Sequence, residues 1–143
     1  MIKPATSHSG GCQCGAVRYE VKGALRGVMN CHCSMCQRLH GIFGAYTKIT
    51  DADLSLIEDR GLTWYNSSNT ARRGFCRECG ASMFWQPAGF ATTSIAAGTL
   101  DHTIGLKTIG HIYTAEKSNF YEISDNLPQY PGSVSGTLDR SSA

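Results

Sequence analysis

Hydrophobic and polar residues alternate over short stretches along most of this chain. The clearest case is 16–22, where Val17, Tyr19 and Val21 alternate with charged residues. Alternation with a period of two predicts a half-buried β-strand. Further strands are predicted at 28–30, 42–49, 54–57, 62–65, 71–75, 81–85, 91–97, 106–109, 111–113 and 120–123. The pattern therefore predicts an all-β fold of many short strands.

The turns between these stretches predict how the strands connect. The segment 23–27 begins and ends with glycine, so 16–22 and 28–30 are expected to form a hairpin that leads into a group of cysteines. After that group, Ser34 is expected to cap a short turn of helix that Gly41 ends. This turn is the only helical feature that the pattern predicts.

Length and composition bound the organisation of the chain. Its 143 residues predict a single domain, 1–143, in which 1–9 and 133–143 are loose tails. Charged residues make up 17% of the chain, and 16 glycines favour tight turns between short strands. No pattern in the sequence predicts an oligomeric state.

Charge and hydropathy exclude several classes of partner. A net charge of +2 without a run of Lys or Arg does not indicate nucleic-acid binding. No apolar run approaches the roughly 18 residues that a membrane helix needs, so no membrane partner is expected. Residues 1–11 contain no apolar segment of the kind found in signal peptides. We therefore expect a cytoplasmic protein.

Four of the seven cysteines form two short pairs that predict a closed metal site. A disulfide framework would leave one of seven thiols unpaired, and a reducing cytosol does not sustain such a framework. Each pair is followed by a glycine, which allows a tight turn at the sulfurs. The predicted ligands of this structural zinc are Cys12, Cys14, Cys76 and Cys79.

The remaining cysteines, Cys31, Cys33 and Cys36, predict a second zinc site with three thiolates. Three ligands leave one tetrahedral position open. Electron-rich thiolates reduce the Lewis acidity of zinc, so the site suits the binding of a soft external thiol that then acts as a nucleophile. An alternative is that His40 closes a Cys₃His structural site in a non-catalytic, zinc-stabilised binding module. His32 is expected to point away from the metal.

Three segments carry a resemblance to a known family. These are 11–19 (GCQCGAVRY), 31–37 (CHCSMCQ) and 75–80 (FCRECG), with looser matches at 111–113 and 125–128. On these segments the chain resembles the glutathione-dependent formaldehyde-activating (GFA) family, to which a centromere protein V branch is related. The likeness covers about residues 10 to 130.

The resemblance implies a β-tent type of fold, built from small coiled antiparallel sheets, and two zinc ions per chain. It implies an S-(hydroxymethyl)glutathione synthase-like enzyme, a carbon–sulfur lyase by class. Carried over to this sequence, the group of four cysteines would be structural. Cys31, Cys33 and Cys36 would hold the catalytic zinc, where the glutathione sulfur attacks formaldehyde.

Several other residues are candidates for contacts with the substrate. Glutathione has two carboxylates, and Gln37 and Arg38 are the amide and cationic side chains next to the cysteine group, so both are predicted substrate-binding residues. Arg72 and Arg73 precede the second cysteine pair, and we expect them on a solvated face, because most arginines are exposed. His111 is expected to be a core histidine bonded to the backbone rather than a general base. Phe43 and Tyr46 are expected in the core.

Overall fold

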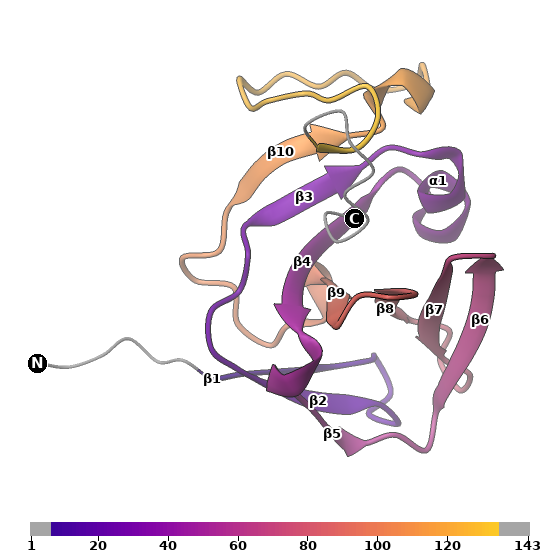
Figure 1. The fold of residues 1–143 in the computed structure, drawn as a ribbon, viewed down its shortest axis with the longest axis vertical. Helices are drawn as coiled ribbons and strands as arrows, with labels where there is room; N and C mark the ends of the chain where they lie inside the picture. Colours follow the sequence, from indigo (N-terminus) through magenta and orange to yellow (C-terminus); the bar gives the residue numbers. More distant parts are fainter. Residues whose placement is uncertain (1–6, 135–143) are drawn as a thin grey trace, which may run out of the picture.

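Ten short strands form most of the regular structure in residues 7–134, the part of the chain that the computed structural model describes (Figure 1). The strands are β1 (Ser7–Gly11), β2 (Arg18–Lys22), β3 (Val28–Cys31), β4 (Gly44–Thr50), β5 (Leu54–Glu58), β6 (Leu62–Ser68), β7 (Ala71–Cys76), β8 (Ser82–Pro87), β9 (Thr92–Ala96) and β10 (Thr108–Ile112). One α-helix, α1, spans Ser34–His40, and single 3-10 turns occur at Asp51–Asp53, Ala97–Thr99 and Thr114–Glu116.

The strands form two sheets. The smaller sheet has the order β1-β2-β5, and the larger has the order β10-β3-β4-β9-β8-β7-β6. All neighbouring strands are antiparallel except β10, which runs parallel to β3. The predicted all-β fold class is confirmed.

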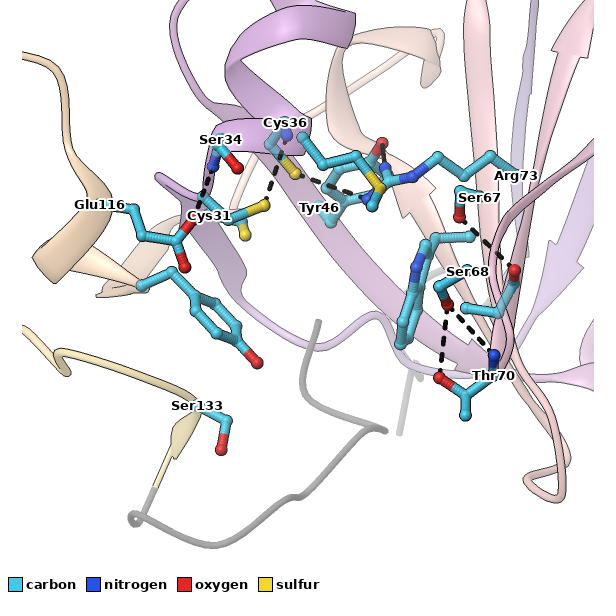
Figure 2. A pocket seen from close by; sticks show the side chains of 15 residues that line it. Cys31, Ser34, Cys36, Tyr46, Ser67, Ser68, Thr70, Arg73, Glu116 and Ser133 are labelled. Carbon is cyan, nitrogen blue, oxygen red and sulfur yellow. Dashed lines mark hydrogen bonds between the residues drawn. The ribbon is translucent and has the colours of Figure 1, made fainter.

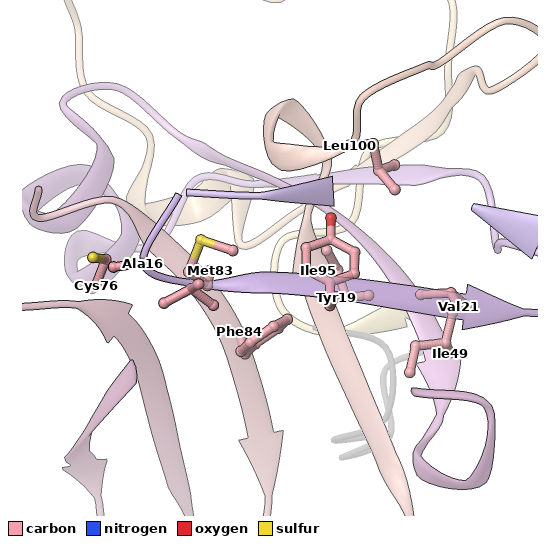
Figure 3. Packing of buried hydrophobic residues seen from close by; sticks show 10 residues of the cluster. Ala16, Tyr19, Val21, Ile49, Cys76, Met83, Phe84, Ile95 and Leu100 are labelled. Atoms are coloured by element: carbon pink, nitrogen blue, oxygen red, sulfur yellow. The ribbon is translucent and has the colours of Figure 1, made fainter. Parts of the chain in front are cut away.

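The main core lies between the two sheets. Tyr19 and Val21 of β2 are buried, as their alternation with charged residues predicts, and they pack against residues of the larger sheet (Figure 3). The ring of Tyr19 meets that of Phe84 edge to face, with centroids 5.5 Å apart. Met83 and Ile95 of the larger sheet belong to the same buried cluster. The smaller sheet therefore covers one part of the larger sheet through its apolar face.

The predicted hairpin between 16–22 and 28–30 is wrong. β2 pairs with β1 and β5, whereas β3 pairs with β4 and β10 in the other sheet. All four residues of β3 are buried, while β2 alternates between buried and exposed positions. A strand buried on both faces belongs inside a large sheet, and a one-sided strand suits a small sheet that faces water.

The predicted loose N-terminal tail is wrong at residues 7–9. Residues 7–9, expected to be loose, belong to β1, which pairs with β2 from Ser7↔Lys22 to Gly11↔Arg18. Glycine at position 10 permits this pairing, because an added Cβ would lie 2.3 Å from the Tyr19 hydroxyl oxygen. The tail predictions for 1–6 and 135–143 lie outside the described residues.

The C-terminal part differs from the predicted strands as well. The stretches 106–109 and 111–113 contribute to one strand, β10, and 120–123 forms no strand. The carbonyl oxygen of Tyr121 accepts a hydrogen bond from the Lys117 ammonium group instead of joining a sheet. We call 113–134 the C-terminal segment; Figure 1 shows it passing beside β10 and the end of β3.

Candidate metal centres and pocket

The four-cysteine group joins two turns that are distant in sequence. Cys12 and Cys14 lie between β1 and β2, while Cys76 ends β7 and Cys79 follows in the turn to β8. Their sulfurs all lie within 4.8 Å of one another. The Cys14 sulfur is 3.8 Å from those of Cys12 and Cys76, far longer than the roughly 2.05 Å of a disulfide. A tetrahedral site with zinc–sulfur bonds of about 2.3 Å has edges of about 3.8 Å, so these sulfurs fit zinc.

The turns that carry these cysteines are shaped for thiolates. Gly15 and Gly80 adopt φ values of 89° and 81°, in the left-handed region that glycine enters without strain. The backbone N–H of Val17 donates to the Cys12 sulfur at 3.2 Å. Such donors favour the deprotonated sulfur that a metal requires. This local structure agrees with a closed metal site.

The three-cysteine group lies where β3 meets α1. Cys31 ends β3, Cys33 is the N-cap of α1, and Cys36 lies in the first turn of the helix. The Cys33 sulfur accepts a hydrogen bond from the backbone N–H of Cys36 at 3.3 Å. Ser34, the predicted cap, is instead the first helical residue, while Gly41 ends the helix as predicted, with φ of 91°. The helix start therefore brings the three sulfurs within 4.8 Å of one another.

Histidine does not complete this group. Nε2 of His40 lies 2.7 Å from the Tyr46 hydroxyl oxygen, and the two rings pack edge to face. Among residues 7–134, the metal-ligating side chains that converge here are the three cysteines alone. His32 points away from the sulfurs, as predicted, and its ring nitrogens contact other side chains. Burial lowers the pKa of His32 to about 4, with a smaller contribution from His111.

Arg73 of β7 is the cation beside the three-cysteine group. Its Nη2 lies 3.8 Å from the Cys36 sulfur, and its Nη1 donates to the Tyr46 hydroxyl oxygen at 3.3 Å. Hydrogen bonds from the Cys31 and Cys36 thiols hold the pKa of Cys33 below its ordinary value, and the charge of Arg73 contributes further. The surroundings therefore favour the thiolate at Cys33, whereas the pKa values of the Cys31 and Cys36 thiols are raised beside it.

A pocket of about 380 Å³ opens onto these sulfurs. Figure 2 shows Glu116 on one side of the cysteines and Arg73 on the other. The lining residues come from the cysteine turn, the β6–β7 hairpin, neighbouring strands and the C-terminal segment: Cys31, Cys33, Ser34, Met35, Cys36, Tyr46, Ser67, Ser68, Thr70, Ala71, Arg73, Trp85, Tyr113, Glu116 and Ser133. The pocket thus combines convergent thiols with one cation, one carboxylate and several hydroxyls.

Comparison with known proteins identifies the family. Residues 7–116 match the family described as glutathione-dependent formaldehyde-activating enzyme. The chain belongs to the GFA family. The crystal structure of a Rhodobacter sphaeroides protein is similar: it is 25% identical, the match covers 85% of this chain and 98% of that chain, and the TM-score is 0.56. The predicted resemblance is confirmed.

The two predicted substrate-binding residues of this GFA-family chain lie outside the pocket lining. Nε2 of Gln37 donates to the carbonyl oxygens of His32 and Glu116, at 2.8 and 2.7 Å, and its amide oxygen accepts from Ser118. Arg38 lines a second pocket, beyond Arg73. The Gln37 amide is thus occupied by the protein itself, and the cation that reaches the sulfurs is Arg73 rather than Arg38.

The sequence did not show that Arg73 lies beside the three-cysteine group. Successive side chains of a strand point to opposite faces, so the sequence places Arg72 and Arg73 on different faces of β7. It does not show which of these faces is turned towards the cysteines. His111 is buried as predicted, but its ring nitrogens contact the side chains of His32 and Asp125 rather than the backbone. Tyr46 is buried as predicted, yet it also lines the pocket.

Among residues 7–134, the helices all fall short of the length and apolar character that a membrane crossing needs.

Proposed function

We propose that this GFA-family chain adds the thiol of glutathione to formaldehyde to give S-(hydroxymethyl)glutathione, and catalyses the reverse carbon–sulfur cleavage. One observation carries the proposal. Three sulfurs, of Cys31, Cys33 and Cys36, converge at the wall of a pocket, with no fourth ligating side chain beside them among the described residues. Such a site can take a soft donor from outside the chain.

The two cysteine groups have different proposed roles. The group of Cys12, Cys14, Cys76 and Cys79 would hold one zinc with no open position, which is typical of a structural site. The three-cysteine group would hold the second zinc. Zinc bound there supplies positive charge that favours the thiolate form of an incoming thiol. All donors are sulfur, which suits zinc and a thiol substrate alike.

The pocket residues then have definite tasks in the addition. The carbon–sulfur bond forms as the C=O π electrons move to oxygen, and that oxygen takes up the proton that the thiol has lost, so no oxidant or net proton is needed. Arg73 offers guanidinium N–H groups to the developing oxygen charge, a form of stabilisation that pre-positioned donors provide. The same charge favours the substrate thiolate beside Cys36.

The alternative function, a binding module with a Cys₃His site, has weaker support. It requires His40 as the fourth ligand, and this side chain contacts Tyr46 and lies outside the donor group.

For location, we propose the cytoplasm, because all seven cysteines are free thiols and such thiols persist in a reducing compartment.

Magnetisation-exchange NMR tests the proposal, because it measures interconversion of formaldehyde and S-(hydroxymethyl)glutathione at equilibrium. The zinc-loaded protein is compared with a protein-free blank, since thiols also add to formaldehyde unaided. We expect the zinc-loaded protein to give an exchange rate well above that of the blank. Cys33→Ser should lose this excess rate while it keeps the fold and the four-cysteine site. Exchange that is equal in wild type, variant and blank would overturn the proposal.

A further inference from the structure

Behind the three-cysteine group, four side chains form a continuous series of hydrogen bonds. The Tyr121 hydroxyl oxygen lies 2.5 Å from Nδ1 of His32, and Nε2 of His32 lies 2.9 Å from Nδ1 of His111. Nε2 of His111 lies 3.0 and 3.1 Å from the carboxylate oxygens of Asp125. None of these four side chains lines the pocket, and the proposed reaction gives them no task.

The series has a consistent direction. The Asp125 carboxylate can only accept, so Nε2 of His111 carries a proton. With both histidines neutral, Nδ1 of His111 then accepts from Nε2 of His32, and Nδ1 of His32 accepts from the Tyr121 hydroxyl. Every donor and acceptor in the series is therefore used, and each bond fixes the tautomer of the next ring.

The series connects two parts of the molecule that sequence separates. His32 lies between two of the three cysteines and is fully buried, with the Phe43 ring packed 5.1 Å from its own. His111 comes from β10, and Tyr121 and Asp125 come from the C-terminal segment. The bonds therefore hold the cysteine turn against the same segment that supplies Tyr113, Glu116 and Ser133 to the pocket.

A second contact reinforces this connection. The backbone N–H of Ser34 donates to the Glu116 carboxylate at 2.9 Å, one residue after Cys33. The position of the Cys33 sulfur thus depends on contacts from the C-terminal segment on both sides of that residue, through His32 and through Ser34.

We propose that Asp125, His111 and Tyr121 are positioning residues that hold the Cys31–Cys33 turn in its metal-binding geometry. Loss of Asp125 removes the charged acceptor that fixes the orientation of the buried His111 ring, so the ring is no longer held in place. His32 would move with its partner and carry the neighbouring sulfurs with it. The inference rests on the proposed function, because it assumes that the three cysteines hold a metal.

The test uses cobalt, whose thiolate absorption bands report ligand geometry. The full-length protein and its variants are loaded with cobalt, and titration with a chromophoric chelator measures the metal affinity. The spectrum of Cys33→Ser gives the contribution of the four-cysteine site alone. Asp125→Ala should weaken metal binding at the three-cysteine site by about tenfold or more and change its cobalt spectrum. Asp125→Asn keeps an acceptor oxygen and should restore most of the affinity.

Two further variants separate positioning from general stability. Asp101→Ala breaks an ion pair at 2.6 Å with Arg18 of the smaller sheet, so it should change neither the cobalt spectrum nor the metal affinity of the three-cysteine site. Tyr121→Phe removes one hydroxyl but keeps the ring stacked on His32, so it should fold normally and shift the cobalt bands less than Asp125→Ala does.

The outcomes distinguish the two proposals. If the wild type binds a second cobalt that Cys33→Ser loses, and Asp125→Ala matches the wild type in spectrum and affinity, the positioning inference is wrong and the proposed function stands. If the wild type binds no metal through Cys33, the proposed function fails as well.

Discussion

The guanidinium of Arg73 lies 3.8 Å from the sulfur of Cys36, and it reaches that position from β7. The same strand ends three residues later at Cys76, a member of the four-cysteine group. One strand thus contributes to both cysteine groups. A metal at the four-cysteine group would fix the end of β7, and through it the cation beside the three-cysteine group.

Arg73→Gln should weaken thiol binding. Removing the cation takes away a charge-assisted contact worth about 1.5–3 kcal/mol, so we expect a loss in glutathione affinity of about tenfold or more by calorimetry. Arg72→Gln is the matched control: its guanidinium stacks 3.8 Å from the Trp64 ring on the other face of β7. Equal affinities in the two variants would show that Arg73 does not act on the thiol.

His40→Ala should keep both metals. Its ring contacts Tyr46 rather than the sulfurs, so the zinc content by mass spectrometry under native conditions should match that of the wild type. Cys33→Ser should lose one zinc in the same measurement. Loss of zinc from His40→Ala would instead support the Cys₃His alternative.

Gly61→Ala should destabilise the four-cysteine group. A Cβ at this buried position would lie 2.7 Å from the Ala16 Cβ and 2.9 Å from the Cys76 sulfur. Overpacking of this kind costs about 1–3 kcal/mol, which should appear as a lower midpoint of thermal unfolding. Gly98→Ala is the control, because nothing lies within 4 Å of the added atom. If Gly61→Ala unfolds at the same temperature as the wild type, the turn accommodates the added methyl group without loss of stability, and this prediction is wrong.

The two sites should differ in their importance for folding. Cys14→Ser removes a ligand of the site that joins the β1–β2 turn to the end of β7, and structural zinc contributes on the order of 10 kcal/mol to folding. We expect a large loss of thermal stability, compared with a small one for Cys33→Ser. Differential scanning calorimetry makes the comparison; similar losses in both variants would contradict the division of roles.

Local patterns predicted those parts of the structure that local chemistry determines. The cysteine spacings predicted both groups, and the alternation around Tyr19 predicted its buried face. The pattern could not show that β3 pairs with β4 and β10 rather than with β2, which precedes it in the sequence, because strand pairing depends on distant strands.

The candidate site depends even more on distant partners. Arg38 is adjacent to the cysteines in sequence, yet Arg73 contacts Cys36 across 37 residues. His32 and His111, which contact each other, are 79 residues apart in the sequence. The C-terminal segment contacts His32 through Tyr121 and His111 through Asp125, and it has no periodic pattern. Only the folded arrangement reveals such contacts.

Cadmium NMR tests the central claim most directly, because each cadmium ion gives its own signal and the shift follows the number of sulfur ligands. The protein loaded with isotope-enriched cadmium should show two signals, one for each cysteine group. On addition of glutathione, one signal should move towards the position of a four-sulfur site, and Cys33→Ser should lack that signal. If neither signal responds to glutathione, no substrate thiol joins Cys31, Cys33 and Cys36, and the proposed site is wrong.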